Sequence, residues 1–146
     1  MKATRRLVTT ALFLMLAPAG FAQALPAKFH PSRDAAADVA LAIATARSQG
    51  KRVMVEVGGE WCSWCKLLDR FIADNADVQA SLDANYVFVK VNYSPENKNA
   101  ALLSRWPKVV GYPHLFVLDT DGKLLLSQNT GELEAGKDYD LSLIHI

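Results

Sequence analysis

Hydrophobic and polar positions along this chain switch between helical spacing and extended runs, and the switching predicts a mixed α/β domain. Apolar residues three and four positions apart predict helices, whereas β-branched runs and strict alternation predict strands. We expect helices over 34–49, 62–73, 75–84 and 95–106, and strands over 52–57, 86–91, 114–118 and 123–128.

The order of these elements predicts how the strands pair. A strand, a crossover and a second strand favour parallel pairing, while the Asp121-Gly122 turn between the last two strands favours an antiparallel hairpin. The sequence therefore predicts a mixed four-stranded sheet flanked by helices.

The first 24 residues have the pattern of a cleaved signal peptide. Lys2, Arg5 and Arg6 precede an apolar run over 7–16, and the stretch 22–24 reads Ala-Gln-Ala, a typical cleavage site. The alternative is a membrane anchor, for which the apolar run is short. We expect a periplasmic or secreted protein.

The remainder divides into three parts. Residues 25–33 contain two prolines and no periodicity, which predicts a linker before a single domain over 34–140. The last six residues, 141–146, are those that a transposon adaptor sequence encodes, so we expect a non-native tail; a natural short tail is the alternative. If the tail is non-native, a closing helix is missing, one sheet face is exposed and stability is reduced.

Charge and cysteine content narrow the function classes. Outside residues 1–24 the chain has 13 basic and 15 acidic residues, which gives no reason to expect nucleic acid as a partner. The chain has two cysteines, only three positions apart, so they cannot form a framework of distant disulfides.

Cys62 and Cys65 are the strongest candidates for chemistry. They follow a predicted buried strand and open a predicted helix, where free backbone N–H groups and the helix dipole stabilise a thiolate. A thiolate is the species that attacks a disulfide. We therefore expect Cys62 to be a nucleophile more reactive than free cysteine, and Cys65 to resolve the mixed disulfide.

Three other interpretations of the cysteine pair remain: half of a zinc site, a haem attachment site and an inert disulfide. Structural zinc needs four ligands, and the chain offers no second cysteine pair and only His30, His114 and His145. Haem attachment needs a histidine after the second cysteine, where the chain has Lys66. We expect no bound cofactor and no metal.

The segment Glu-Trp-Cys-Ser-Trp-Cys-Lys over 60–66, with Glu56 six residues before Cys62, resembles the thioredoxin superfamily, and most of all secreted members with a Trp-Cys-x-Trp-Cys site. The resemblance spans about 51–131. It implies a thioredoxin-like fold in which Glu56 is a buried acid that accepts the proton of Cys65. Burial would raise the pKa of this carboxyl; an edge-exposed glutamate is the alternative.

Two further features belong to the same resemblance. Lys90 occupies the place of a lysine that pairs with the buried acid, although a solvated strand lysine is equally compatible. Gly-Tyr-Pro-His over 111–114 matches the loop whose cis proline faces the cysteines, which implies a cis bond before Pro113 and a backbone surface for substrate. The alternative is an ordinary trans proline opening a strand.

The chain also departs from the usual pattern. Ser63-Trp64 replaces the common Gly-Pro dipeptide, and His114 replaces a threonine, from where it would touch the sulfurs or face solvent. Trp61, Trp64 and Tyr112 are candidate substrate-binding residues at an apolar rim, although Trp61 is also expected to pack on the core. Phe71 and Trp106 are expected in the core.

These features predict a thiol–disulfide oxidoreductase that acts on protein substrates outside the cytoplasm. We expect a reductase or interchange activity rather than an oxidase, recycled by a membrane or periplasmic redox partner. A non-catalytic binding module with a closed disulfide is the alternative, and a metal-handling protein is a weaker one.

Overall fold

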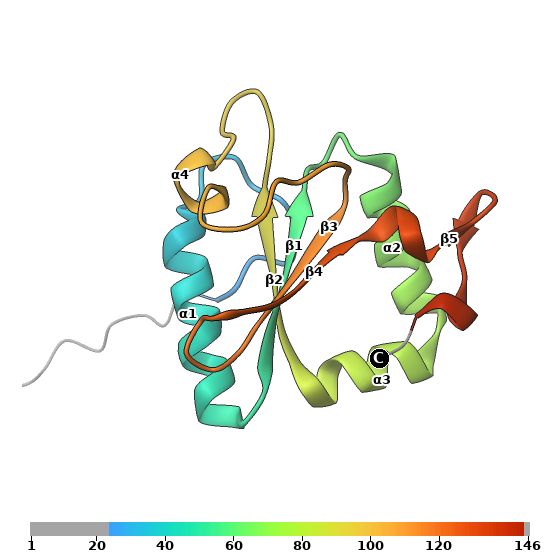
Figure 1. The fold of residues 1–146 in the computed structure, drawn as a ribbon, viewed down its shortest axis with the longest axis horizontal. Helices are drawn as coiled ribbons and strands as arrows, with labels where there is room; N and C mark the ends of the chain where they lie inside the picture. Colours follow the sequence, from blue (N-terminus) through green and yellow to red (C-terminus); the bar gives the residue numbers. More distant parts are fainter. Residues whose placement is uncertain (1–23, 145–146) are drawn as a thin grey trace, which may run out of the picture.

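A computed structural model describes residues 24–144, and Figure 1 shows these as one sheet with helices on both faces. Residues 1–23 and 145–146 lie outside the described part, and so does nearly all of the predicted signal peptide. Within 24–144, no helix is long and apolar enough to cross a membrane.

The sheet has four strands in the order β2-β1-β3-β4. They are β1 (Arg52–Gly58), β2 (Tyr86–Asn92), β3 (His114–Leu118) and β4 (Leu124–Asn129). β1 is parallel to β2 and antiparallel to β3, and β3 is antiparallel to β4. The predicted mixed four-stranded sheet is confirmed.

The first helix, α1 (Ala35–Gln49), covers one face of the sheet (Figure 1). Asp34 caps its start by accepting a hydrogen bond from the backbone N–H of Ala37, and Gly50 ends it in the left-handed conformation. Its alanines allow close approach to the alternate valines of β1 and β2. The core on this face comprises Val39, Ala42, Ala46, Val53, Val55, Val57, Val87, Val89, Val91, Phe116 and Leu118, among others.

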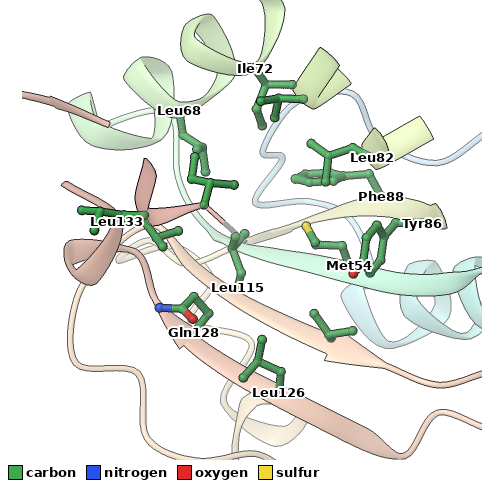
Figure 2. Close-up of a pocket in the computed structure, with 14 residues that line it drawn as sticks. Met54, Leu68, Ile72, Leu82, Tyr86, Phe88, Leu115, Leu126, Gln128 and Leu133 are labelled. Atoms are coloured by element: carbon green, nitrogen blue, oxygen red, sulfur yellow. The ribbon is translucent and has the colours of Figure 1, made fainter. Parts of the chain in front are cut away.

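Two consecutive helices, α2 (Ser63–Asp74) and α3 (Ala76–Asn85), cover part of the other face. Leu68 on α2 and Leu82 on α3 pack there with Met54, Leu115 and Val117. A hollow of about 200 Å³ lies between these residues and β4, and Leu126 and Leu133 also line it (Figure 2). This face of the sheet is therefore incompletely filled beside β4.

The predicted helix over 95–106 is wrong except for one turn, α4 (Ala100–Leu103). Polar side chains hold the preceding residues in a loop: the Asn92 amide donates to the Ser94 hydroxyl over 3.0 Å, and the Asn99 amide donates to the Asn92 carbonyl over 2.6 Å. Asn99 itself has a φ of 47°. Side-chain bonds to the backbone compete with helical ones, and asparagine tolerates the left-handed region.

The chain after β4 forms short elements that the hydrophobic pattern does not predict. A 3₁₀ helix, η1 (Thr130–Leu133), leads into a small hairpin of β5 (Glu134–Ala135) and β6 (Asp138–Tyr139), followed by η2 (Leu141–Leu143). Figure 1 places this hairpin beside α2. Its Tyr139 is buried in the core of the α2 face.

Candidate functional site

Cys62 and Cys65 form a disulfide at the start of α2, with their Cα atoms 5.2 Å apart. Cys62 is the N-cap of the helix, and its sulfur accepts a hydrogen bond from the backbone N–H of Cys65 over 3.1 Å. The first sulfur thus lies at the positive end of the helix dipole with a donor already aimed at it, as the sequence predicts. The same contacts would stabilise a thiolate on Cys62 after reduction.

Both cysteines are buried, Cys62 at 3% exposed and Cys65 at 0%. The relative depth agrees with the prediction that Cys65 is the inner cysteine. Access to Cys62 is limited in the disulfide form, because Phe29, Trp64 and Tyr112 pack around the pair. Little of the disulfide is therefore exposed to a substrate thiol.

Two glycines at the end of β1 make room for the site. A Cβ atom on Gly58 would lie 2.5 Å from the Cys65 sulfur, and one on Gly59 would lie 2.3 Å from the indole nitrogen of Trp61. Neither distance is compatible with a side chain. A glycine pair between a strand and a cysteine pair is a signal of such close approach in a sequence.

Glu56 and Lys90 form an ion pair beside the disulfide. They face each other in the parallel register of β1 and β2, with Lys90 Nζ 2.5 Å from Glu56 Oε2 and 2.7 Å from Asp69 Oδ1. Glu56 is fully buried, so the edge-exposed alternative is excluded; Lys90 is paired rather than solvated.

Burial raises the pKa of Glu56 to about 7, against the lowering effect of Lys90. Burial lowers the pKa of Lys90, but the Glu56 and Asp69 carboxylates outweigh it and the pKa is raised overall. Lys90 therefore stays charged at neutral pH while Glu56 can exchange a proton. Glu56 Oε1 has no hydrogen-bond partner among the described residues. This oxygen is therefore free to accept a proton.

Pro113 is buried, and the bond between Tyr112 and Pro113 is cis, as the resemblance implied. Thr130, the first residue of η1, donates a hydrogen bond from its hydroxyl to the Pro113 carbonyl over 2.5 Å. A buried threonine so far along the chain gave no signal in the sequence. Its contact ties the proline loop to the end of β4.

Trp61 lies outside the core, contrary to the expectation that it packs there. It is 55% exposed, its indole N–H donates to the Tyr93 carbonyl over 2.7 Å, and its ring meets Tyr112 edge to face at 5.5 Å. Tyr93 stacks on Tyr112 at 4.9 Å. A surface hollow of about 690 Å³ borders Trp61 and Tyr93. These three aromatic rings form an accessible apolar surface next to the disulfide.

Trp64 points the other way, into the core of the α2 face. Its ring meets Tyr139 edge to face at 5.5 Å, and Phe71 lies against the same tyrosine at 5.8 Å. Trp64 thus joins the disulfide to the β5–β6 hairpin rather than extending the exposed aromatic surface. Phe71 and Trp106 both pack against core clusters, as expected.

His114 neither touches the sulfurs nor faces solvent, so both expectations for it are wrong. It is buried on β3, its Nε2 is 2.8 Å from the Ser127 hydroxyl of β4, and its ring packs on Phe116 at 4.6 Å. Side chains alternate along a strand, which places His114 with Phe116 on the α1 face. Burial lowers its pKa, which favours the neutral ring.

The segment 25–33, expected as a linker, packs against the site. Phe29 is 4% exposed and lies beside Cys62 and Cys65. A single large apolar residue in a proline-flanked polar stretch is the only signal for this in the sequence.

No group of three or more His, Cys, Asp or Glu side chains within residues 24–144 is placed to hold a metal ion. Of the predicted residues, Trp64 and Tyr112 pack against the disulfide, Trp61 meets Tyr112, and Glu56 pairs with Lys90.

Comparisons with known proteins agree with this geometry. A family model described as thioredoxin-like matches residues 34–120, more than half of the chain. The thiol:disulfide interchange protein DsbD of Colwellia psychrerythraea is 32% identical over 87 residues, 58% of this chain and 14% of that protein. DsbD of Actinobacillus pleuropneumoniae is 33% identical over 91 residues, 62% of this chain and 15% of that protein. The chain thus corresponds to about a seventh of these relatives.

Among solved structures, the disulphide isomerase from Xylella fastidiosa Temecula1 is similar with a TM-score of 0.64 and 25% identity, over 75% of this chain and 82% of that one. The family match includes the strand and helix that carry the cysteine pair. The chain belongs to the thioredoxin-like family.

Proposed function

We propose that this protein is a thiol–disulfide oxidoreductase that exchanges a dithiol for a disulfide with protein substrates outside the cytoplasm. The observation that carries the proposal is the Cys62–Cys65 disulfide at the start of α2, where the Cys62 sulfur accepts the Cys65 N–H. Its relatives named thiol:disulfide interchange proteins support the reaction class.

The reaction starts from the reduced pair. The Cys62 thiolate attacks a substrate disulfide, so a Cys62–substrate bond forms and the substrate S–S bond breaks, releasing one thiolate that takes up a proton. Cys65 then gives its proton to Glu56 and attacks the Cys62 sulfur. The second substrate thiol leaves, and the two electrons of the dithiol have reduced the substrate disulfide.

In the proposed reaction this protein reduces the substrate, and a partner protein afterwards restores the Cys62–Cys65 dithiol. Trp61, Tyr93 and Tyr112 supply an exposed surface for an extended substrate segment next to the buried sulfurs. Recycling requires a second dithiol protein, which we place in the membrane or the periplasm in keeping with the leader-like pattern of residues 1–24. The likeness to secreted proteins with a Trp-Cys-x-Trp-Cys site belongs to the same proposal.

A non-catalytic binding module is the second candidate, and the low exposure of Cys62 favours it. Insulin reduction with dithiothreitol distinguishes the two. We expect the wild type to accelerate precipitation of insulin chains and Cys62→Ser to be inactive. Cys65→Ser should accumulate a mixed disulfide through Cys62, visible by mass spectrometry. A wild-type rate equal to the background would eliminate the catalytic function.

A further inference from the structure

The N-terminal strap, which we define as residues 24–33, is fastened to the folded domain at several points. Arg33 pairs with Asp38 of α1 and donates to the Ala24 carbonyl over 3.2 Å. The Phe29 N–H donates to Glu60 Oε1 over 3.1 Å, and the Asn97 amide donates to the Pro31 carbonyl over 2.8 Å. These contacts come from α1, the β1–α2 loop and the β2–α4 loop, so the strap has a defined position.

The strap places the Phe29 ring at the centre of the site. A Cβ atom on Gly58 would lie 3.0 Å from this ring and 2.5 Å from the Cys65 sulfur, so the ring and the sulfur border the same point of β1. Lys90 Nζ lies 4.6 Å from the centre of the ring. Phe29 therefore contacts both the inner cysteine region and the lysine of the buried ion pair.

Glu56 lies on the same face of β1, two residues and about 6.6 Å before Gly58. The charged groups that act on it come from every side: Lys90 on β2, Asp69 on α2 and Glu60 in the β1–α2 loop. Lys90 Nζ donates to Oε2 of Glu56 and to Oδ1 of Asp69, and the other Glu56 oxygen has no partner among the described residues. The apolar Phe29 ring borders this arrangement on the side of Lys90.

We propose that Phe29 is a positioning residue for the thiol–disulfide exchange proposed above: it seals Cys65 and the Glu56–Lys90 pair from water. With the seal in place, the Cys65 proton passes to Glu56 instead of to bulk solvent. The ring also holds Lys90 against Glu56, because a cation is attracted to the face of an aromatic ring. The inference rests on the proposed function for its role in turnover, but the seal itself is a property of the fold.

The experiment measures the titration of Cys65 in a Cys62→Ser background, by thiolate absorbance at 240 nm. Phe29→Ala is expected to lower the apparent pKa of Cys65 by at least one unit, because water reaches a thiol that is otherwise desolvated. Phe29→Leu fills the site with an apolar side chain and should stay within about 0.3 units of the parent. Leu25→Ala, in the same strap but packed against the α1-face core, is the matched control and should leave the titration unchanged.

Phe29→Val provides a smaller truncation if Phe29→Ala does not fold, and thermal melting reports on folding for each variant. An unchanged Cys65 titration in a folded Phe29→Ala or Phe29→Val protein would overturn the proposal, as would an equal shift in Leu25→Ala. The titration does not require turnover. If Phe29→Ala shifted the Cys65 titration but the wild type had no insulin reductase activity, the proposed function would be refuted and the proposed seal would stand.

Discussion

At the residue scale, the chemistry of the site depends on how Glu56 is held. Its carboxyl group is fully buried, one oxygen is paired with Lys90, and the other has no partner among residues 24–144. Desolvation disfavours the charged form, and this raises its pKa to about 7. A carboxyl in this condition is an effective proton acceptor near neutral pH.

We expect stability to fall with rising pH because of Glu56. The folded chain keeps its proton up to about pH 7, whereas the unfolded chain loses it near the ordinary value of 4.5. Between these pH values the folded state binds one proton more than the unfolded state. Raising the pH therefore lowers the free energy of unfolding by up to about 1.4 kcal/mol per pH unit. Denaturant unfolding of the oxidised protein from pH 4.5 to 7.5 measures this slope.

Glu56→Gln should flatten this slope, since an amide does not titrate. Asp74→Asn, which removes an exposed carboxylate at the end of α2, should leave it in place. If the unfolding free energies of the wild type and Glu56→Gln changed in parallel with pH, the slope could not be assigned to Glu56.

Gly58→Ala should destabilise the protein by about 1–3 kcal/mol, because the new Cβ has no space between the Cys65 sulfur and the Phe29 ring. Gly111→Ala is the control, since the nearest atom to its added Cβ is 3.7 Å away. Urea unfolding compares the two. Equal stabilities would show that the end of β1 moves aside without cost.

The sequence predicted the residues whose position follows from strand register and loop motif, and missed those that depend on distant packing. Glu56 and Lys90 meet because β1 and β2 are parallel and in register. The burial of Cys62, by contrast, depends on Phe29, which lies more than thirty positions earlier. Periodicity carries no information about such a contact, and neither does the spacing of the cysteines.

At the element scale, α2 is held at its cysteine-bearing end by the β5–β6 hairpin. Tyr139 of β6 packs against Trp64 and Phe71, and its hydroxyl is 3.4 Å from the Trp64 carbonyl. The hairpin was not predicted, because two-residue strands have no measurable alternation. The predicted helix over 95–106 is mostly absent for a different reason. The side chains of Asn92 and Asn99 donate hydrogen bonds to backbone carbonyls, and these bonds compete with those of a helix.

Tyr139→Ala should cost about 3–5 kcal/mol, the usual effect of removing a buried aromatic ring. Tyr139→Phe should cost less than about 1 kcal/mol, because the hydroxyl bond is long and only partly buried. Hydrogen exchange of the first turn of α2 should accelerate in the alanine variant alone. Unchanged exchange there would show that the hairpin does not hold the helix.

At the scale of the whole molecule, the face of the sheet under α2 and α3 contains an apolar hollow. The hollow lies beside β4 and is lined by residues such as Met54, Leu68 and Leu115 (Figure 2). Leu126 on β4, an edge strand, lines this hollow and is 49% exposed. The topology follows from element order, but the incomplete filling does not, because it depends on how far α2 and α3 extend over the sheet.

The native protein should therefore bind the hydrophobic dye ANS at the hollow. Leu126→Glu should reduce dye fluorescence and change stability by less than about 1 kcal/mol, since the side chain is half exposed. Leu125→Glu is the matched control, because Leu125 is similarly exposed but does not line the hollow. Equal losses of fluorescence from both variants, or no dye binding by the wild type, would contradict the prediction.

The shortness of the loop closed by the disulfide has a thermodynamic consequence. Only three positions separate the two sulfurs, so the bond restricts the unfolded chain little. Reduction and unfolding nevertheless form a closed cycle of four states. The difference in unfolding free energy between oxidised and reduced protein must equal the difference in bond strength between the folded and unfolded chain. A substitution that changes the difference between the two unfolding free energies must change the difference between the folded and unfolded bond strengths by the same amount, so denaturation curves of the two redox forms measure what the fold does to the bond.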